Sequence, residues 1–469
     1  TIANIDSFKR LVKRRVDPLE VNMRRYLFRS KLPVLRFRKI EIHGVTENEK
    51  DYILKILKQN GEAYFSLEDF KVGYFKLLAD KKITEIIPHA VYDETDDSFK
   101  LILDVTMNNS VHLAVGANLS SSTSNQVYLG VEYGILNQFS QHYYIDAYMG
   151  RILNAISLKA VIFSTDDRPR YLSTEFSSMN YNMFQGEKLF YKDDRPAYIK
   201  QHESFLKFRY ALPVSNNSKM EFGFAGAVLK DKYMQTKLET FSENSFDQST
   251  YLLLDGSARL EKNDLNSKQY PTEGGFRHLT AQYITGAESF RYPDSIGNST
   301  PKGDKSLSYV QLSGGFEQYL QQKGKFILGL KGEAVFNNKR ALDNYTSSII
   351  QAPSFSPTLH SKTTFNEAYR SNQFLALGVL PIVNLYPSLF LRTEFYGFFP
   401  LTMYERGPDQ IAVTTRSWSN MQYIAEGSLV YNLPFTTLSL FVNNYSYPKG
   451  NWNVGINIGY LLFGRRFVE

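Results

Sequence analysis

Residues 127–135 read Val-Tyr-Leu-Gly-Val-Glu-Tyr-Gly-Ile and alternate between two kinds of side chain. Every second residue from Val127 to Ile135 is apolar or aromatic, whereas the residues between them are glycine, glutamate or tyrosine. Successive side chains of a strand point to opposite faces, so one face is apolar and the other is small or polar. A transmembrane β-strand of about 9–11 residues has this pattern, with lipid on one side and a lumen on the other.

The pattern recurs through the C-terminal three quarters of the chain. Sixteen strand-length segments can be marked out, at 111–121, 125–136, 140–152, 154–164, 169–184, 203–214, 218–233, 249–264, 275–289, 308–322, 324–338, 372–386, 388–399, 419–433, 435–447 and 451–463. Their connectors mostly alternate between short ones, such as 215–217, and long ones, such as 339–371. A soluble sandwich also alternates along its strands, but unequal rims are typical of membrane barrels. We therefore predict an all-β, 16-stranded antiparallel transmembrane β-barrel over residues 109–469.

Residues 39–108 predict a small α+β domain with the order β-α-α-β-β. Capping boxes, Thr46-x-x-Glu49 and Ser66-x-x-Asp69, open its two helices. Two strands, at 86–92 and 99–105, close it. Such a domain can offer a sheet edge to an extended peptide by β-augmentation, and a rigid spacer is the alternative.

Residues 1–38 are basic and have a helical pattern, which predicts a linker helix; contact with anionic lipid head groups is the alternative. The whole chain holds 54 basic and 47 acidic residues, a bias too weak to indicate nucleic acid. It has no cysteine, which excludes disulfides and thiolate metal sites, and we expect no metal or cofactor. Its 32 Tyr and 34 Phe suit the aromatic girdles of a barrel.

The connector 264–274 is long, although it occupies a position in the alternation where the other connectors are short. It reads Asp-Leu-Asn-Ser-Lys-Gln-Tyr-Pro-Thr-Glu-Gly, so an acidic residue, Asp264, precedes the aromatic-Pro-x-x-Gly run Tyr270, Pro271 and Gly274. Proline fixes φ, and glycine permits a tight entry into the next strand. With the β-α-α-β-β domain and the sixteen strands, this turn resembles the POTRA-containing outer-membrane assembly and two-partner-secretion barrels. One POTRA domain after a basic linker is most similar to the patatin-linked branch.

The resemblance also implies a site inside the barrel. In this family a long loop folds back into the lumen, where an arginine at its tip meets acidic wall residues. The matching loop here ends Tyr-Arg-Ser-Asn-Gln-Phe, which places the arginine at Arg370 without the family's following glycine. Arg392 and Glu394 are two apart, and facing lipid would be costly for both, so they should face the lumen. We predict an Arg370–Glu394 ion pair, with Arg392 and Glu333 as further lumen charges; a solvent-exposed Arg370 is the alternative.

The resemblance implies a function in the bacterial outer membrane, with the POTRA domain in the periplasm. Such a protein inserts, anchors or translocates a polypeptide, here the patatin-like lipase that would lie N-terminal to this chain. Implied partners are outer-membrane lipid, lipopolysaccharide and an extended polypeptide at the POTRA edge or barrel seam, and a homodimer stays open. The alternatives are an assembly factor for other barrels, a passive 16-strand porin and a barrel enzyme.

Two features bear on these alternatives. The seven histidines are scattered and no Gly-x-Ser-x-Gly elbow occurs, so we expect no catalytic residue in this chain. The barrel must close between residues 111–121 and 452–463, and Gly455 and Gly459 weaken the last strand. We therefore expect a short or irregular seam.

Overall fold

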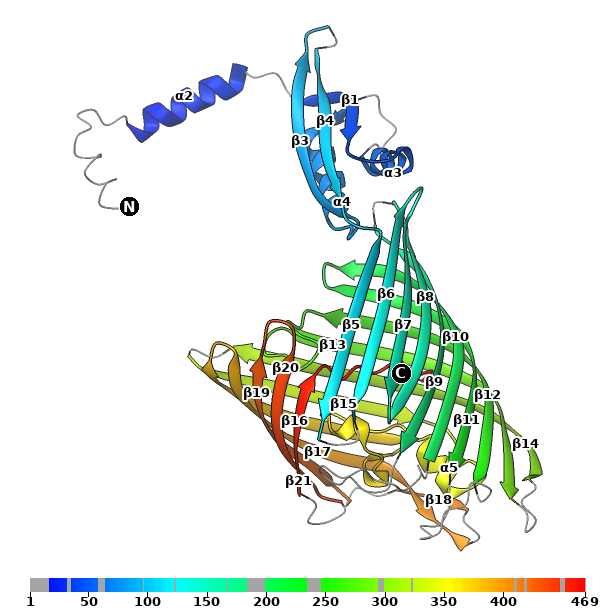
Figure 1. Cartoon of the computed structure of the whole chain (residues 1–469). Helices are drawn as coiled ribbons and strands as arrows, with labels where there is room; N and C mark the ends of the chain where they lie inside the picture. The colour runs from blue at the N-terminus through cyan, green and yellow to red at the C-terminus, as the bar shows by residue number, and fades with distance from the viewer. Residues whose placement is uncertain are drawn as a thin grey trace. The chain divides into compact units, whose positions relative to one another are not determined.

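The computed structural model describes residues 17–31, 35–57, 64–95, 97–121, 124–166, 168–183, 199–233, 246–293, 299–321, 324–408, 411–416, 420–447 and 452–468. The chain divides into two compact units, Thr1–Asn108 and Asn109–Glu469 (Figure 1). Within the described residues no helix is long and apolar enough to cross a membrane.

The N-terminal unit is a four-stranded sheet with two helices, preceded by a separate helix. Its elements are α2 (Pro18–Lys31), β1 (Arg36–His43), α3 (Glu47–Leu57), β2 (Phe65–Ser66), α4 (Leu67–Leu78), β3 (Ile83–Asp93) and β4 (Ser98–Met107). The sheet order is β2-β1-β4-β3, with β1 parallel to β4 and the other pairs antiparallel. The predicted β-α-α-β-β order is present, and the two-residue β2 is an addition to it.

Local sequence explains the two helices of this unit. The backbone N–H of Thr46 donates to Glu49 (2.9 Å) before α3, and Ser66 and Asp69 form a complete capping box at α4. The bonds from Ser66 hold the pKa of Asp69 below its ordinary value. Gly44 follows β1 with φ +82°, where a Cβ would lie 2.2 Å from the carbonyl oxygen of Val105. Only glycine fits there.

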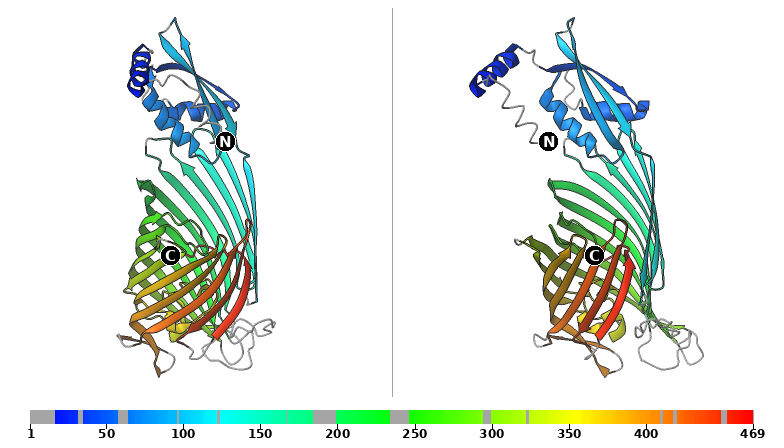
Figure 2. Two further views of the ribbon diagram at one scale, coloured as in Figure 1. Left: turned by 90° about the vertical axis from the view of Figure 1, so that its left-hand side faces the viewer. Right: turned by 60° about the vertical axis from the view of Figure 1, so that its left-hand side comes forward.

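The C-terminal unit is a closed antiparallel barrel (Figures 1 and 2). Its strands are β5 (Val111–Ser120), β6 (Gln126–Leu136), β7 (Ser140–Gly150), β8 (Leu153–Phe163), β9 (Tyr171–Met183), β10 (Ile199–Ser215), β11 (Ser218–Tyr233), β12 (Asp247–Asn263), β13 (Gly275–Pro293), β14 (Ser299–Gln321), β15 (Phe326–Asn337), β16 (Gln373–Tyr386), β17 (Leu389–Arg406), β18 (Ala412–Arg416), β19 (Gln422–Asn432), β20 (Thr437–Tyr445) and β21 (Trp452–Gly459). β17 pairs directly with β19, and among the described residues the short β18 pairs only with the far end of β17, so sixteen of the described strands form the ring.

The apolar strand faces point outward, as the alternation predicts. On β6, Val127 and Leu129 are 49% and 44% exposed, and on β21 Trp452 is 69% exposed. The opposite faces line the lumen and bury charged groups, including Glu203, Asp231 and Glu288. An outward apolar belt around a polar interior suits a bilayer rather than water.

The barrel closes through a short seam. β21 and β5 share three register pairs, Asn457–Ser120, Ile458–Leu119 and Gly459–Asn118, whereas β20 and β21 share seven. The short seam expected from the sequence is therefore present. The last strand ends at Gly459 and not at the predicted residue 463.

Candidate functional site

Three segments fold into the lumen and meet there. One is the turn 264–274 between β12 and β13, which we call the inner turn. A second is residues 338–372 between β15 and β16, which we call the plug loop, and the third is residues 460–468 after β21, which we call the strap. Successive strands run in opposite directions, so the inner turn lies at the rim where β5 begins and the plug loop arises from the other rim.

The inner turn is held by the residues that the sequence singled out. Asp264 accepts a hydrogen bond from the backbone N–H of Gly275 (2.7 Å), and Gly274 has φ +86°. Tyr270 also has a positive φ, 53°, and its buried hydroxyl donates to Ser439 of β20 (3.0 Å). The turn thus reaches from β12 to a strand on another part of the wall.

Arg392 of β17 fixes this turn to the wall. Its guanidinium donates to the carbonyl oxygen of Pro271 (2.7 Å), to the hydroxyl of Tyr319 (2.9 Å) and to the carboxylate of Glu394. Glu394 also accepts from the hydroxyl of Tyr396 (2.5 Å). Arg392 is 4% and Glu394 6% exposed, and both lie on the face of β17 that contacts the inner turn.

The plug loop crosses the lumen, as Figure 1 shows for the yellow segment that carries α5 (Tyr345–Ile350). At one end Asn344 donates to the hydroxyl of Tyr233 on β11 (2.7 Å). Further along, His360 bonds with the hydroxyl of Tyr445 on β20 (2.9 Å). Phe355 packs between these ends against Phe398 of β17, with ring centroids 6.0 Å apart. Because β11 and β20 lie far apart in the ring, the loop spans it.

Among the contacts of the residues that the structure describes, the predicted ion pair between Arg370 and Glu394 is absent. Arg370 is 8% exposed, and its guanidinium donates to the carbonyl oxygens of Ile350 (2.8 Å) and Ala352 (3.1 Å) in its own loop. Glu394 takes its ion pair from Arg392 instead. Arg392 lies two residues from Glu394 on the same face of β17, so it reaches the carboxylate without any contribution from the plug loop. Arg370 therefore fastens the plug loop to itself and is not exposed.

Glu333 lies on β15, two residues from Lys331, whose ammonium pairs with Glu317 (3.1 Å). It faces the same side of the strand as Lys331 and is only half-buried.

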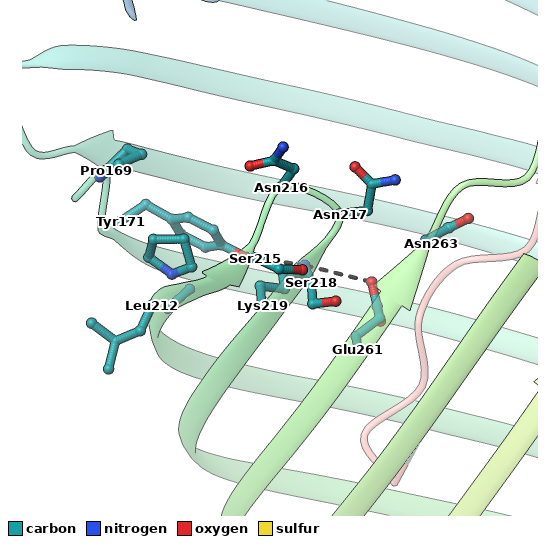
Figure 3. Close-up of a pocket in the computed structure, with 12 residues that line it drawn as sticks. Pro169, Tyr171, Leu212, Ser215, Asn216, Asn217, Ser218, Lys219, Glu261 and Asn263 are labelled. Carbon is teal, nitrogen blue, oxygen red and sulfur yellow. Dashed lines mark hydrogen bonds and ion pairs between the residues drawn. The ribbon is translucent and has the colours of Figure 1, made fainter. Parts of the chain in front are cut away.

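A separate pocket of about 320 Å³ opens at the rim of the inner turn, among the turns around β9 to β12 (Figure 3). In this pocket the ammonium of Lys219 lies 3.7 Å from the carboxylate of Glu261, so the positive and negative charges of the pocket lining compensate each other.

The residues of β10 that hold the strap were not among those predicted from the sequence. Glu203 and Lys207 on β10 bind Arg466 and Phe467. The available signal was the pair Arg465-Arg466 after the last strand, which needs acidic partners if the segment is buried.

Replacing Arg370 with alanine should destabilise the folded barrel, because two buried carbonyl groups lose a charged donor. We expect a loss of roughly 1.5–3 kcal/mol, with partial recovery in Arg370→Lys, which keeps the charge but not the forked geometry. The temperature at which the compact band disappears on a gel measures this. Arg340→Ala is the control, because this arginine of the same loop is exposed. Equal midpoints for the two alanine variants would contradict the role of Arg370.

No family model and no curated protein matches the chain. Among solved structures, BamA from Haemophilus ducreyi, in a crystal structure lacking POTRA domains 1–3, matches with a TM-score of 0.65 at 14% identity, covering 91% of this chain and 84% of that one. The fold is BamA-like. CdiB from Acinetobacter baumannii and CdiB from Escherichia coli match with TM-scores of 0.47 and 0.48, at 10% and 12% identity. Each match covers 91% of this chain, and 74% and 76% of the two CdiB chains.

Proposed function

We propose that this chain is an outer-membrane barrel that handles a polypeptide, by inserting, anchoring or translocating it. The observation that carries the proposal is the seam, where three register pairs join β21 to β5. In the described part of the chain, residues 111–116 of β5 pair with β6 alone, so one edge of this strand is open. An open strand edge is a template for pairing with another extended chain.

The plug loop separates this proposal from a passive porin. A porin of this size keeps an aqueous channel, whereas here a loop spans the lumen from β11 to β20. We propose further that the N-terminal unit is a POTRA-type domain in the periplasm. Its edge strand β3 carries exposed Ile87 and Val91, and Pro88 lies in it, where a proline is tolerated because one side is unpaired.

The finer proposal is that the carried polypeptide is a patatin-like lipase encoded upstream of Thr1. Its support is the sequence pattern of one small α+β domain after a basic segment. Sequencing the gene upstream of Thr1 tests it, since such a lipase needs a Gly-x-Ser-x-Gly elbow. A reading frame that lacks this elbow removes the lipase but leaves the polypeptide-handling barrel in place.

Locking the seam should abolish polypeptide handling. The native chain has no cysteine, so the double variant Leu119→Cys/Ile458→Cys can form one disulfide, across a register pair of the seam. Vesicles that hold the protein receive a urea-unfolded eight-stranded barrel, and its folding is followed by gel mobility. We expect acceleration by the reduced variant and none by the oxidised one.

The matched control locks a pairing that need not open. Leu440→Cys/Ile456→Cys joins β20 to the same strand β21 on the same outward face. This variant should accelerate folding whether oxidised or reduced. Equal activity of the oxidised and reduced seam variant would make the barrel a static anchor.

A further inference from the structure

The outward face of the barrel wall changes from apolar to basic near one rim. This is the rim from which the plug loop arises, and the strands β9 to β13 stand side by side there (Figure 1). Its outward residues include three lysines and one arginine: Lys200 on β10, Lys230 and Lys232 on β11, and Arg291 on β13. They share the parity of the exposed apolar residues of their strands, so they face outward. We call these four residues the basic rim.

The register of the strands sets these cations close together. Lys200 and Lys232 are direct register partners, and Lys230 lies two residues from Lys232 on the same strand face. Gln248 of β12 is the register partner of both Lys232 and Arg291, so these two cations lie two strand spacings apart, about 10 Å. Like charges directly opposite each other destabilise a sheet. An anion bound among the four cations would relieve this repulsion.

The acidic residues at this level of the wall lie on its other face. Glu203, Asp231 and Glu288 belong to the same strands, but they are buried and face the lumen. Over the described residues of β9 to β13, the outward face carries no aspartate or glutamate. The outward charge of this part of the wall is therefore positive, and its natural partner is an anion outside the barrel.

Towards the middle of the barrel the same face is apolar. Two residues along β11 from Lys230 lies Val228, whose register partner on β12 is Leu252. Val228 is 38%, Leu252 64% and Leu206 of β10 42% exposed. A charged side chain that faces hydrocarbon is costly, but near the membrane interface this cost largely disappears. With the membrane placement proposed above, the basic rim thus lies at the head groups of the outer leaflet, and the apolar rows lie beside its acyl chains.

We propose that the basic rim binds the phosphate group of a lipid in the outer leaflet. The guanidinium of Arg291 matches two phosphate oxygens with its forked donors, and the ammonium groups of Lys230 and Lys232 add compact charges. The acyl chains of the same lipid pack on the apolar rows around Leu252. The site rests on the membrane placement in the proposed function, and it adds a lipid ligand at a fixed place on the wall that does not depend on any polypeptide.

A bimane fluorophore on Leu252→Cys reports which lipid lies next to the basic rim. The native chain has no cysteine, so the label attaches at this position alone. The whole chain is reconstituted into phosphatidylcholine vesicles that contain a small share of phosphatidic acid with brominated acyl chains, which quench the fluorophore on contact. The reference is the same share of brominated phosphatidylcholine. We expect stronger quenching by phosphatidic acid, because the choline group neutralises the phosphate of the reference lipid.

Lys230→Gln/Lys232→Gln should remove most of this preference. Each basic residue near an anionic surface strengthens binding about fivefold, so the half-saturating share of phosphatidic acid should rise on the order of 25-fold. Both lysines are exposed, so their replacement leaves the packing of the wall intact. The matched control is Lys262→Gln/Arg277→Gln, which removes two exposed cations from register partners at the other rim. This control should keep the native preference at Leu252→Cys.

Equal quenching by the two brominated lipids, or an equal loss of preference in the matched control, overturns the proposal. Excess inorganic phosphate should leave the quenching unchanged, and recovery of the fluorescence would overturn the assignment to a lipid. Vesicles made wholly of brominated phosphatidylcholine test the membrane placement separately, because they should quench Leu252→Cys in any case. No quenching there would refute the placement in the proposed function, whereas quenching without a preference for phosphatidic acid refutes the lipid site alone.

Discussion

Arg392→Ala should cost the barrel roughly 3–5 kcal/mol, the effect of removing one partner of a buried ion pair. Glu394 would remain in the lumen without its cation, and the carbonyl oxygen of Pro271 would lose its donor. The inner turn should loosen at the same time, because Arg392 is its link to β17. Heat stability of the compact gel band measures the first effect, and protease cleavage within 264–274 measures the second.

A double variant separates the lost ion pair from the lost packing. In Arg392→Ala/Glu394→Gln the uncompensated charge is gone, so part of the stability should return. The hydrogen bond from Tyr396 to residue 394 remains available to the amide. If the losses of stability in Arg392→Ala and in Glu394→Gln simply add up in the double variant, the two residues act independently. The ion pair would then not be the source of the effect.

Replacing residues 343–367 by a short Gly-Ser linker should turn the barrel into an open pore. The walls need not move, because Phe336 of β15 and Gln373 of β16 are already register partners at the base of the loop. Conductance in a planar bilayer should change from none or brief events to large steady steps, since sixteen strands leave an aqueous channel once the lumen is empty.

The matched control for this deletion weakens the loop without removing it. Asn344→Ala breaks the bond to Tyr233 and the cap of α5 but leaves the rest of the plug loop in place. It should give flickering and not steady conductance. A deleted variant that folds and yet does not conduct would mean that the inner turn and the strap close the lumen by themselves.

The fold was predictable because its signals are local. The alternation in 127–135, the capping boxes at Thr46 and Ser66 and the turn ending at Gly274 each depend on residues within a few positions of one another. The spacing of Arg392 and Glu394 is local in the same sense, because two residues set two apart on a strand share one face, and both are buried here.

The partners inside the barrel depend on contacts between distant parts of the chain. Arg466 and Glu203 are 263 residues apart, and nothing near either residue marks the other. The pairing of Arg370 with Glu394 was wrong because parity fixes a face but not which of several cations on that face is nearest. The strand end at Gly459 was missed for a related reason, since residues 460–463 have strand-like composition and are drawn inward by the anchor at β10.

The strands differ greatly in length around the ring, and with the membrane placement proposed above this affects the lipid. β21 has eight residues, whereas β14 has 23. At about 3.4 Å per residue and a tilt of about 40°, eight residues cover roughly 21 Å of bilayer, against a hydrocarbon core of about 30 Å. Lipid beside the seam should therefore be compressed, and lipid beside β14 should not. A thinned, disordered patch of bilayer next to the open edge of β5 would lower the barrier for a new strand to enter the membrane there.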